Sequence, residues 1–381
     1  MSQLNVDTIK KADGTGNLSV PAETGTVVTT ASPSLGRRNM VLNGSMAVAQ
    51  RGTSETGVTS MKYANAPDHY QLVINAMGAY TASQSTDAPD GFANSYRIEC
   101  TTADASPAAS DYFFFWTKHE GQDVQHLKFG TASAQQLTLS FWIKSNMTGT
   151  WQVNFRDKDS GRLITGTYTT NSADTWEYKT ITIDGDTGGS GFTNDNNESF
   201  SLEFVLGAGN NFTSGTAPTA WEASVNANRG ASNTVNIASS TSNYWAITGV
   251  QLEVGSVATP FEHRSYGEEL ALCQRYYITY RGTNNAYWMF SGITDAGYLH
   301  ISTGGVFPTE MRAAPSVTIY SASGDGYIDA YGRGQYGQGN AGATENTTMG
   351  FNTVSLQAGG GSATGNAGAI MRGGYRADAE L

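Results

Sequence analysis

The chain has 381 residues, a length that suggests two or three domains. Glycine contributes 45 residues, above its usual share of ~7%, and charged residues make up 14% where ~25% is typical. With 19 Tyr, 15 Phe and 7 Trp, this composition disfavours disorder and long helices, and it suits short strands joined by turns.

The charge and the apolar pattern exclude several classes of protein. The net charge is −11 and no basic cluster is longer than Arg37-Arg38, so we expect no nucleic-acid partner. No apolar run approaches the ~18 residues of a membrane span, so we expect no membrane insertion. The start of the chain does not resemble a secretory signal. Two cysteines, Cys100 and Cys273, do not make a disulfide framework.

Residues 1–36 are polar and have few aromatic side chains. Residues 4–9 alternate apolar and polar, as a strand does, and Asp13-Gly14 is a turn signal. The segment has too little apolar surface for a core of its own, so we expect it to pack on a partner chain or to stay mobile.

Residues 37–264 hold most of the large apolar side chains, in strand-like segments separated by turn residues. This texture predicts an all-β fold with an antiparallel β-sandwich, and helical patterns long enough for a parallel α/β fold are missing. The segments are 96–100, 112–116, 137–143, 151–155, 178–183, 200–206 and 244–254. The segment 112–116 is apolar on both faces and predicts a central strand.

One short helix is expected after the sandwich. It opens at Ser265-Tyr266-Gly267, with Glu268 and Glu269 near its N-terminus, and it ends near Arg275. Residues 321–374 are glycine-rich and hold too few large apolar residues to fold alone. We therefore expect a C-terminal glycine-rich β domain whose core is completed by neighbours in an intertwined oligomer.

Patterns typical of catalysis are scarce. The sequence has no His or Cys metal pattern, no G-x-S-x-G elbow and no phosphate-binding loop. Asp184 and Asp186 lie in a turn-like stretch, and Glu198 and Glu203, five residues apart, would face opposite sides of a strand. A glycosidase site is therefore disfavoured, and no cofactor is expected. Asp195, in the run 194–197, is a weak Ca²⁺ candidate, for which an Asx-rich turn is the favoured interpretation.

The aromatic residues are the remaining indication of function. Sugar rings stack on Trp and Tyr, so exposed aromatics in a weakly charged protein suggest carbohydrate binding. Three tryptophans lie in strand-like segments and are expected in the core: Trp142, Trp176 and Trp245. Three tyrosines lie among glycines and are the predicted ligand-binding residues, with core packing in an oligomer as the alternative: Tyr327, Tyr331 and Tyr336.

Long strings in the sequence resemble a module of bacteriophage tail fibres, especially those of marine phages. They include NMVLNGSMAVAQRGT at 39–53, NYWAITGVQLE at 243–253, TPFEHRSYGEEL at 259–270, CQRYY at 273–277 and MRAAPSV at 311–317. The start at 4–9 also resembles the start of many such fibres. The resemblance covers residues 1–320, and the glycine-rich end departs from it.

The resemblance implies a homotrimeric tail fibre or receptor-binding protein whose middle module is a jelly roll like those of carbohydrate-binding modules. Residues 1–36 would attach to a tail or baseplate adaptor protein, residues 37–264 would form the sandwich, and residues 265–381 would hold the helix and the distal tip. The expected partner is a surface glycan of the host, and the expected location is the virion tail, assembled in the host bacterial cytoplasm. We expect no enzyme; the alternatives are a purely structural virion component and a polysaccharide depolymerase.

Overall fold

The computed structural model describes the side chains of residues 37–279, 307–316, 318 and 376–381, together with the backbone of further strands on either side. The chain divides into two compact units, Met1–Gly36 and Arg37–Leu381. In the first unit, β1 (Ile9–Lys10) and β2 (Asn17–Leu18) form an antiparallel pair. The predicted strand at 4–9 otherwise lies outside the described residues.

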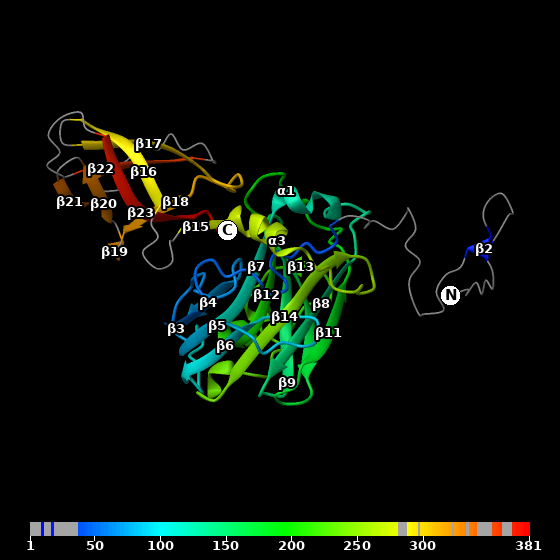
Figure 1. Cartoon of the computed structure of the whole chain (residues 1–381). Coiled ribbons are helices and arrows are strands. Elements are labelled where there is room, and N and C mark those ends of the chain that lie inside the picture. Colours follow the sequence, from blue (N-terminus) through cyan, green and yellow to red (C-terminus); the bar gives the residue numbers. More distant parts are fainter. Residues whose placement is uncertain are drawn as a thin grey trace. The chain divides into compact units, whose positions relative to one another are not determined.

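Two six-stranded antiparallel sheets form a β-sandwich in the second unit (Figure 1). One, here called the β12 sheet, has the order β13 (Glu222–Ala223), β10 (Arg162–Thr170), β9 (Gly149–Asp157), β12 (Glu198–Ala208), β7 (Tyr112–Glu120), β4 (Gln71–Asn75). The other, the β14 sheet, has the order β11 (Glu177–Ile183), β8 (Leu137–Ser145), β14 (Tyr244–Val254), β6 (Ser95–Thr102), β5 (Ala79–Ser85), β3 (Ser54–Val58). The chain crosses repeatedly from one sheet to the other, as in a jelly roll.

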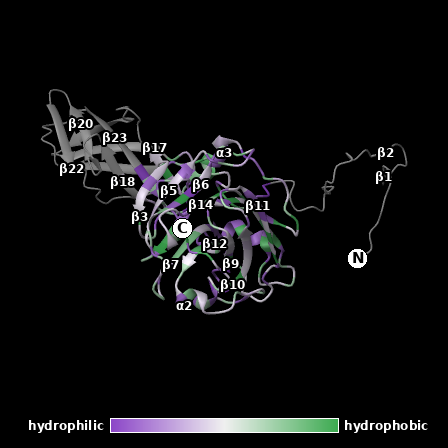
Figure 2. Cartoon of the chain, turned by 90° about the horizontal axis from the view of Figure 1, so that it is seen from below, coloured by the Kyte–Doolittle hydropathy of each residue, from purple (hydrophilic) through white to green (hydrophobic). Residues whose placement is uncertain are grey.

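The core lies between the two sheets and follows the alternation of the strands. Hydrophobic and hydrophilic residues are interspersed along the strands of the sandwich (Figure 2). In β8, the four residues predicted to share a face are fully buried: Leu137, Leu139, Phe141 and Ile143. The predicted all-β antiparallel fold is therefore confirmed, and each of the seven predicted segments between 96 and 254 lies in a strand.

The outer face of the β12 sheet is also partly covered. Phe113 and Phe115 of β7 point into the core, while Phe114 points outward into a small cluster with Phe212 of the short helix α2 (Asn210–Thr213). The apolar residues on both faces of 112–116 are thus explained, because β7 lies inside the sheet between β12 and β4.

Short helices complete the described part of this unit. After β7, α1 (Gly121–Val124) makes a single turn. The predicted helix at the end of the sandwich is α3 (Tyr266–Gln274), where the Ser265 side chain caps the N-terminus by accepting from the Glu268 N–H. Cys273 is buried on this helix. Within the described residues, no helix is long and apolar enough to cross a membrane.

The backbone beyond α3 forms a further antiparallel sheet. Its main order is β19 (Gly324–Asp325), β18 (Ser316–Ser321), β23 (Gly368–Asp378), β16 (Trp288–Asp295), β17 (Tyr298–Val306), β22 (Thr353–Gly359). Three more strands join it, β15 (Tyr277–Tyr280), β20 (Tyr327–Gly332) and β21 (Gln335–Asn340). The glycine-rich end thus contains β structure, while the predicted intertwining and the domain boundary at 264 stay predictions.

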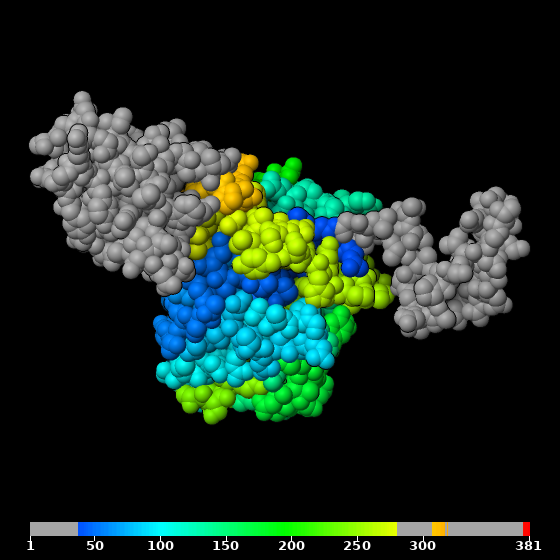
Figure 3. Space-filling model, in the orientation of Figure 1, coloured from blue at the N-terminus to red at the C-terminus, as the bar shows by residue number. Residues whose placement is uncertain are grey.

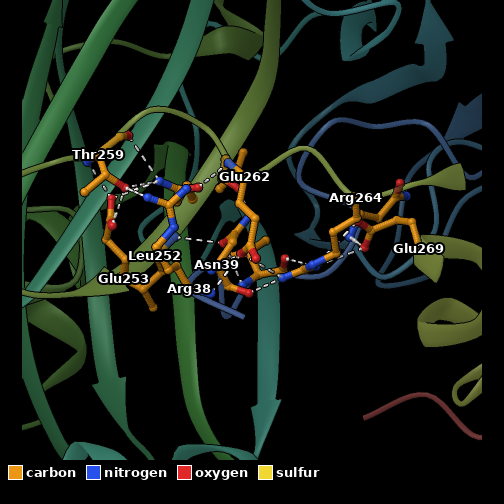
Figure 4. A network of polar contacts seen from close by, with 12 residues as sticks. Arg38, Asn39, Leu252, Glu253, Thr259, Glu262, Arg264 and Glu269 are labelled. Atoms are coloured by element: carbon orange, nitrogen blue, oxygen red, sulfur yellow. Dashed lines mark hydrogen bonds and ion pairs between the residues drawn. The ribbon is translucent and has the colours of Figure 1, made fainter. Parts of the chain in front are cut away.

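The segment that begins the sandwich lies against the segment that ends it (Figure 3). Their contact is polar (Figure 4). Asn39 donates from its side-chain amide to the Val250 carbonyl (3.0 Å), and its backbone N–H donates to Glu262 (2.6 Å). Arg264 donates to the carbonyl of Asn39 and pairs with Glu269 (3.4 Å). These contacts close the sandwich by joining the two ends of its chain segment.

Candidate functional site

The predicted ligand-binding tyrosines lie in the glycine-rich end. Tyr327 and Tyr331 belong to β20, and Tyr336 belongs to β21, where it pairs in register with Tyr331. Their side chains lie outside the described residues, so their role stays a prediction.

The weak Ca²⁺ candidate Asp195 lies in the segment between β11 and β12. Its two carboxylate oxygens accept from the backbone N–H (2.9 Å) and side-chain amide (2.7 Å) of Asn197. The adjacent Asn196 instead bonds to Arg312, whose guanidinium returns a bond to the Asn196 carbonyl. Among the described residues, no group of three or more His, Cys, Asp or Glu side chains could hold a metal ion.

A polar and aromatic cluster lies on the outer face of the β12 sheet, and we call it the Trp116 face. Its residues are Gln71, Trp116, Lys118, Asn154, Arg156, Ser201, Glu203 and Arg229. Trp116, Arg156 and Arg229 are half-buried, and its other members are buried. The strand register brings most of them together. One row across the sheet pairs Gln71 with Trp116, Trp116 with Glu203, and Glu203 with Asn154. The next row pairs Lys118 with Ser201, and Ser201 with Arg156.

Three cations surround the half-buried Trp116. Its ring centroid lies 5.4 Å from Lys118 Nζ and 5.8 Å from the guanidinium carbons of both Arg156 and Arg229. Arg229 comes from the loop after β13 and also lies over the ring of Phe114, at 4.5 Å. At such distances each cation is attracted to the ring, which fixes the orientation of the indole.

Glu203 is the negative centre of this face. Its carboxylate is fully buried and accepts from Arg156 Nη1 (2.5 Å), from Arg229 Nη2 (3.0 Å) and from the amide of Asn154 (3.2 Å). Two guanidinium groups therefore share one carboxylate. Lys118 has its own partners in Glu198 (3.6 Å) and the carbonyl of Leu381, and burial lowers the pKa of its ammonium group. Arg156 and Arg229 carry two positive charges against the one negative charge of Glu203, so one positive charge is in excess beside Trp116.

The expectation that Glu198 and Glu203 face opposite sides of a strand was wrong. Alternation over five residues predicted that they face opposite sides, yet both pair with cations of the Trp116 face. The cause is a register shift between Glu198 and Phe200 in the pairing of β12 with β7. A β-bulge of this kind interrupts the alternation of side chains.

Several polar atoms of the Trp116 face are not matched within the described part of the chain. Two donors, Trp116 Nε1 and Arg156 Nε, have no acceptor, and Gln71 Oε1 has no donor. The Ser201 hydroxyl also lacks a partner. Buried polar groups normally find partners, and leaving one unmatched costs roughly 1–3 kcal/mol. The face thus combines an aromatic ring, excess positive charge and unmatched donors and acceptors, which suits a ligand with hydroxyl and acidic groups.

The expectation that the strand tryptophans are core residues holds for one of them. Trp245 is fully buried, whereas Trp142 and Trp176 are half-buried. Trp142 points away from the core because Phe141 and Ile143 on either side of it point inward. From the sequence, Trp116 was considered only as part of a central strand. Lys118, two residues later and so on the same side of the strand, was the signal that Trp116 points to an outer face.

Comparison with known proteins supplies structural neighbours. No family model matches the sequence, and no curated protein does. Among solved structures, a putative sugar binding protein from Bacteroides thetaiotaomicron is similar at a TM-score of 0.32 and 11% identity, covering 57% of this chain and 100% of that one. A family 11 carbohydrate-binding module from Clostridium thermocellum, in complex with a mixed-linked tetrasaccharide, matches at 0.26 and 12%, covering 55% and 99%.

A third neighbour is the enzymatically active domain of tailspike protein 4 from bacteriophage CBA120. It matches at a TM-score of 0.29 and 13% identity over 57% of this chain and 21% of that one, so this chain spans about a fifth of its length. Carbohydrate-binding modules and a phage tailspike are therefore among the neighbours in fold. The class of the chain, an antiparallel jelly-roll β-sandwich, rests on its own strand order.

Proposed function

We propose that this protein is a tail fibre or receptor-binding protein of a bacteriophage, which attaches the virion to its host by binding surface polysaccharide. The tail-fibre part of the proposal is supported by the strings between residues 39 and 317. The polysaccharide part is supported by the Trp116 face. In this account the protein acts as a homotrimer in the virion tail, and residues 1–36 join it to an adaptor.

One observation carries the glycan site: Trp116 lies on an outer sheet face among unmatched hydrogen-bonding groups. An indole ring offers a flat apolar surface for the C–H face of a pyranose. Gln71 and Ser201 can each donate and accept, so they suit the hydroxyl groups of a sugar that reaches their buried side chains. This combination of stacking and hydroxyl recognition fits a sugar better than it fits an apolar ligand.

The excess positive charge points to an acidic glycan. The whole chain carries −11, which would repel anionic polysaccharides at long range. At the Trp116 face, however, Arg156 and Arg229 share the single carboxylate of Glu203. Arginine binds carboxylates through two parallel hydrogen bonds, so a uronic acid is the sugar type that this pair suits best.

A glycan array probed with the full-length protein tests the proposal. We expect binding to oligosaccharides that contain uronic acids, and we expect Trp116→Ala to weaken it by about tenfold or more, as for an aromatic anchor. Tyr266→Ala is the matched control, because Tyr266 is exposed and lies on α3 and not on a strand of the β12 sheet. Undiminished acidic-glycan binding by a folded Trp116→Ala protein would rule out this site.

Two other functions remain distinguishable by experiment. A purely structural component would bind no oligosaccharide and no host cells. A depolymerase would release reducing ends from host polysaccharide, and we propose that this protein does not.

A further inference from the structure

A second aromatic surface lies on the outer face of the β14 sheet. Trp142 of β8 and Tyr178 of β11 are register partners, and their ring centroids are 5.3 Å apart. The side chains of Trp142 and Tyr178 both point away from the core. Tyr178 is 45% exposed, which makes it one of the most exposed large aromatic residues in the described part of the chain.

A bulge in β14 extends this surface. The register of β14 with β8 shifts between Thr248 and Gln251, and Gly249 within the shift has φ +63°. A Cβ atom built on Gly249 would lie 2.7 Å from Phe92 Cζ and 3.1 Å from Trp142 Cδ1. Phe92 and Trp142 therefore both lie against the bare backbone of Gly249.

The row of rings continues beyond the bulge. Phe92 contacts Phe261 at 5.0 Å and His263 at 5.4 Å between ring centroids. We call the whole row the Trp142 strip. Its members in order are Tyr178, Trp142, Phe92, Phe261 and His263. None of them is fully buried, so the strip presents a line of partly exposed rings on a sheet face.

In contrast with the Trp116 face, the strip has carboxylates beside it: Asp90 lies two residues before Phe92 and Glu262 follows Phe261, while six further charged residues near the strip are paired. They form three carboxylate–cation pairs, at 2.8, 2.6 and 3.0 Å: Asp87 with Lys144, Glu177 with Lys179, and Glu99 with Arg97. The strip itself has no carboxylate, lysine or arginine. Its charge pattern therefore matches an uncharged ligand.

A buried hydroxyl group gives a second indication of a ligand. Thr248 pairs in register with Trp142 and shares its side of the sheet. It is fully buried, and its Oγ1 atom has no hydrogen-bond partner among the described residues. As the register partner of Trp142, Thr248 places this hydroxyl beside the strip, where it can bond the hydroxyl group of a sugar that reaches it.

We propose that the Trp142 strip is a second glycan site, which binds uncharged polysaccharide chains by stacking their pyranose rings on successive aromatic residues. Rows of partly exposed rings suit sugars, because pyranoses have apolar C–H faces and hydroxyl rims. The strip and the Trp116 face lie on the outer faces of different sheets, so one sandwich would hold two glycan segments of different charge. Two such sites in one chain would raise the avidity for a mixed cell-surface polymer.

Calorimetric titration of the full-length protein tests this site. The neutral probes are xylohexaose, cellohexaose and β-1,4-galactan oligosaccharides, and the acidic probe is oligogalacturonate. We expect Trp142→Ala and Tyr178→Ala each to weaken neutral binding by about tenfold, while acidic binding stays within about twofold. Trp116→Ala should give the reverse pattern, and Tyr266→Ala should change neither.

In this experiment the proposal for each site can be refuted without affecting the proposal for the other. The Trp142 strip would be refuted if the wild-type protein bound no neutral probe, or if Trp116→Ala abolished neutral binding as well. It would also be refuted if Tyr178→Ala, at an exposed position where folding is preserved, left neutral binding unchanged. Loss of acidic binding alone would bear only on the Trp116 face.

Discussion

His119 shows how one buried residue can make stability depend on pH. It lies in β7, its Nε2 atom has no hydrogen-bond partner among the described residues, and Phe200 packs on its ring at 5.8 Å. Burial, with a smaller effect from His69, lowers the pKa of His119 to about 3. The folded protein therefore keeps this imidazole neutral at pH values where the unfolded chain protonates it.

The sign of the effect follows from proton linkage. Between the unfolded pKa of ~6.5 and the folded pKa of about 3, the unfolded state binds the extra proton, so stability falls as the pH falls. At about pH 5 the loss from His119 is ~2 kcal/mol relative to neutral pH. We expect His119→Phe to remove this share of the pH dependence, as measured by urea unfolding. Equal pH dependence in the two proteins would contradict the assignment.

For single residues, the sequence shows which side chains are aromatic or charged, but it does not show what each side chain contacts. Trp245 and Trp142 lie in similar strand-like segments, yet one is core and the other faces outward. The difference depends on which face of the sheet each residue points to. Alternation of apolar and polar residues indicates the face for Trp142. It cannot do so for a run that is apolar on both faces, such as 112–116. The acceptor for Arg156 and Arg229 comes from β12, which is distant in sequence from both, so its identity required the sheet order.

At the scale of elements, the position of the segment 39–44, which precedes β3, depends on close contact with β14. Asn39 bonds the backbone of β14 at Val250 and Leu252. The Gly44 carbonyl accepts a hydrogen bond from the Val250 N–H, and a Cβ atom at Gly44 would lie 2.2 Å from the Val250 carbonyl oxygen. A side chain at this position would separate the two segments.

Two glycine substitutions test this contact. Gly44→Ala should destabilise the protein by about 1–3 kcal/mol, because the methyl group overlaps backbone atoms. Gly267→Ala is the matched control: it lies in α3 with no atom within 4 Å of the added Cβ, and alanine favours helix by up to ~1 kcal/mol. Thermal unfolding of both variants gives the comparison. Similar midpoints for the two would show that the contact with Val250 is not limiting.

Strands and the helix were predictable because their signals are local. Alternation in 137–143 and the cap at Ser265 each involve neighbouring residues. The bulges at Glu198 and Gly249 were not predictable, because they appear only as shifts between paired strands. The Trp116 face and the Trp142 strip both depend on those pairings, so the sequence indicated a sugar-binding chemistry without its location.

In the whole molecule, the unit Arg37–Leu381 combines a sandwich with a glycine-rich sheet. Polar contacts cross the predicted boundary at residue 264. Glu120 of β7 accepts from Arg275 (2.7 Å) and from the Tyr276 hydroxyl (2.6 Å). Arg312 donates to the carbonyl of Asn196 (2.8 Å). The chain from the end of α3 onward is therefore bonded to the sandwich through the buried carboxylate of Glu120 and the guanidinium groups of Arg275 and Arg312.

The proposed assembly is a homotrimer. Sedimentation equilibrium of the full-length protein should give about three times the chain mass of 40.4 kDa. Trimerisation would multiply weak glycan contacts through avidity, so host-cell binding should weaken on dilution into monomers. A monomer at micromolar concentration would contradict the assembly, while leaving the glycan sites of the single chain open to test.

The central claim is that the Trp116 face binds a glycan, and a crystal structure of the full-length protein soaked with oligogalacturonate tests it most directly. We predict a sugar ring stacked on Trp116, with its carboxylate bonded to Arg156 and Arg229. An oligosaccharide bound only elsewhere, or an empty Trp116 face at saturating ligand, would contradict the account.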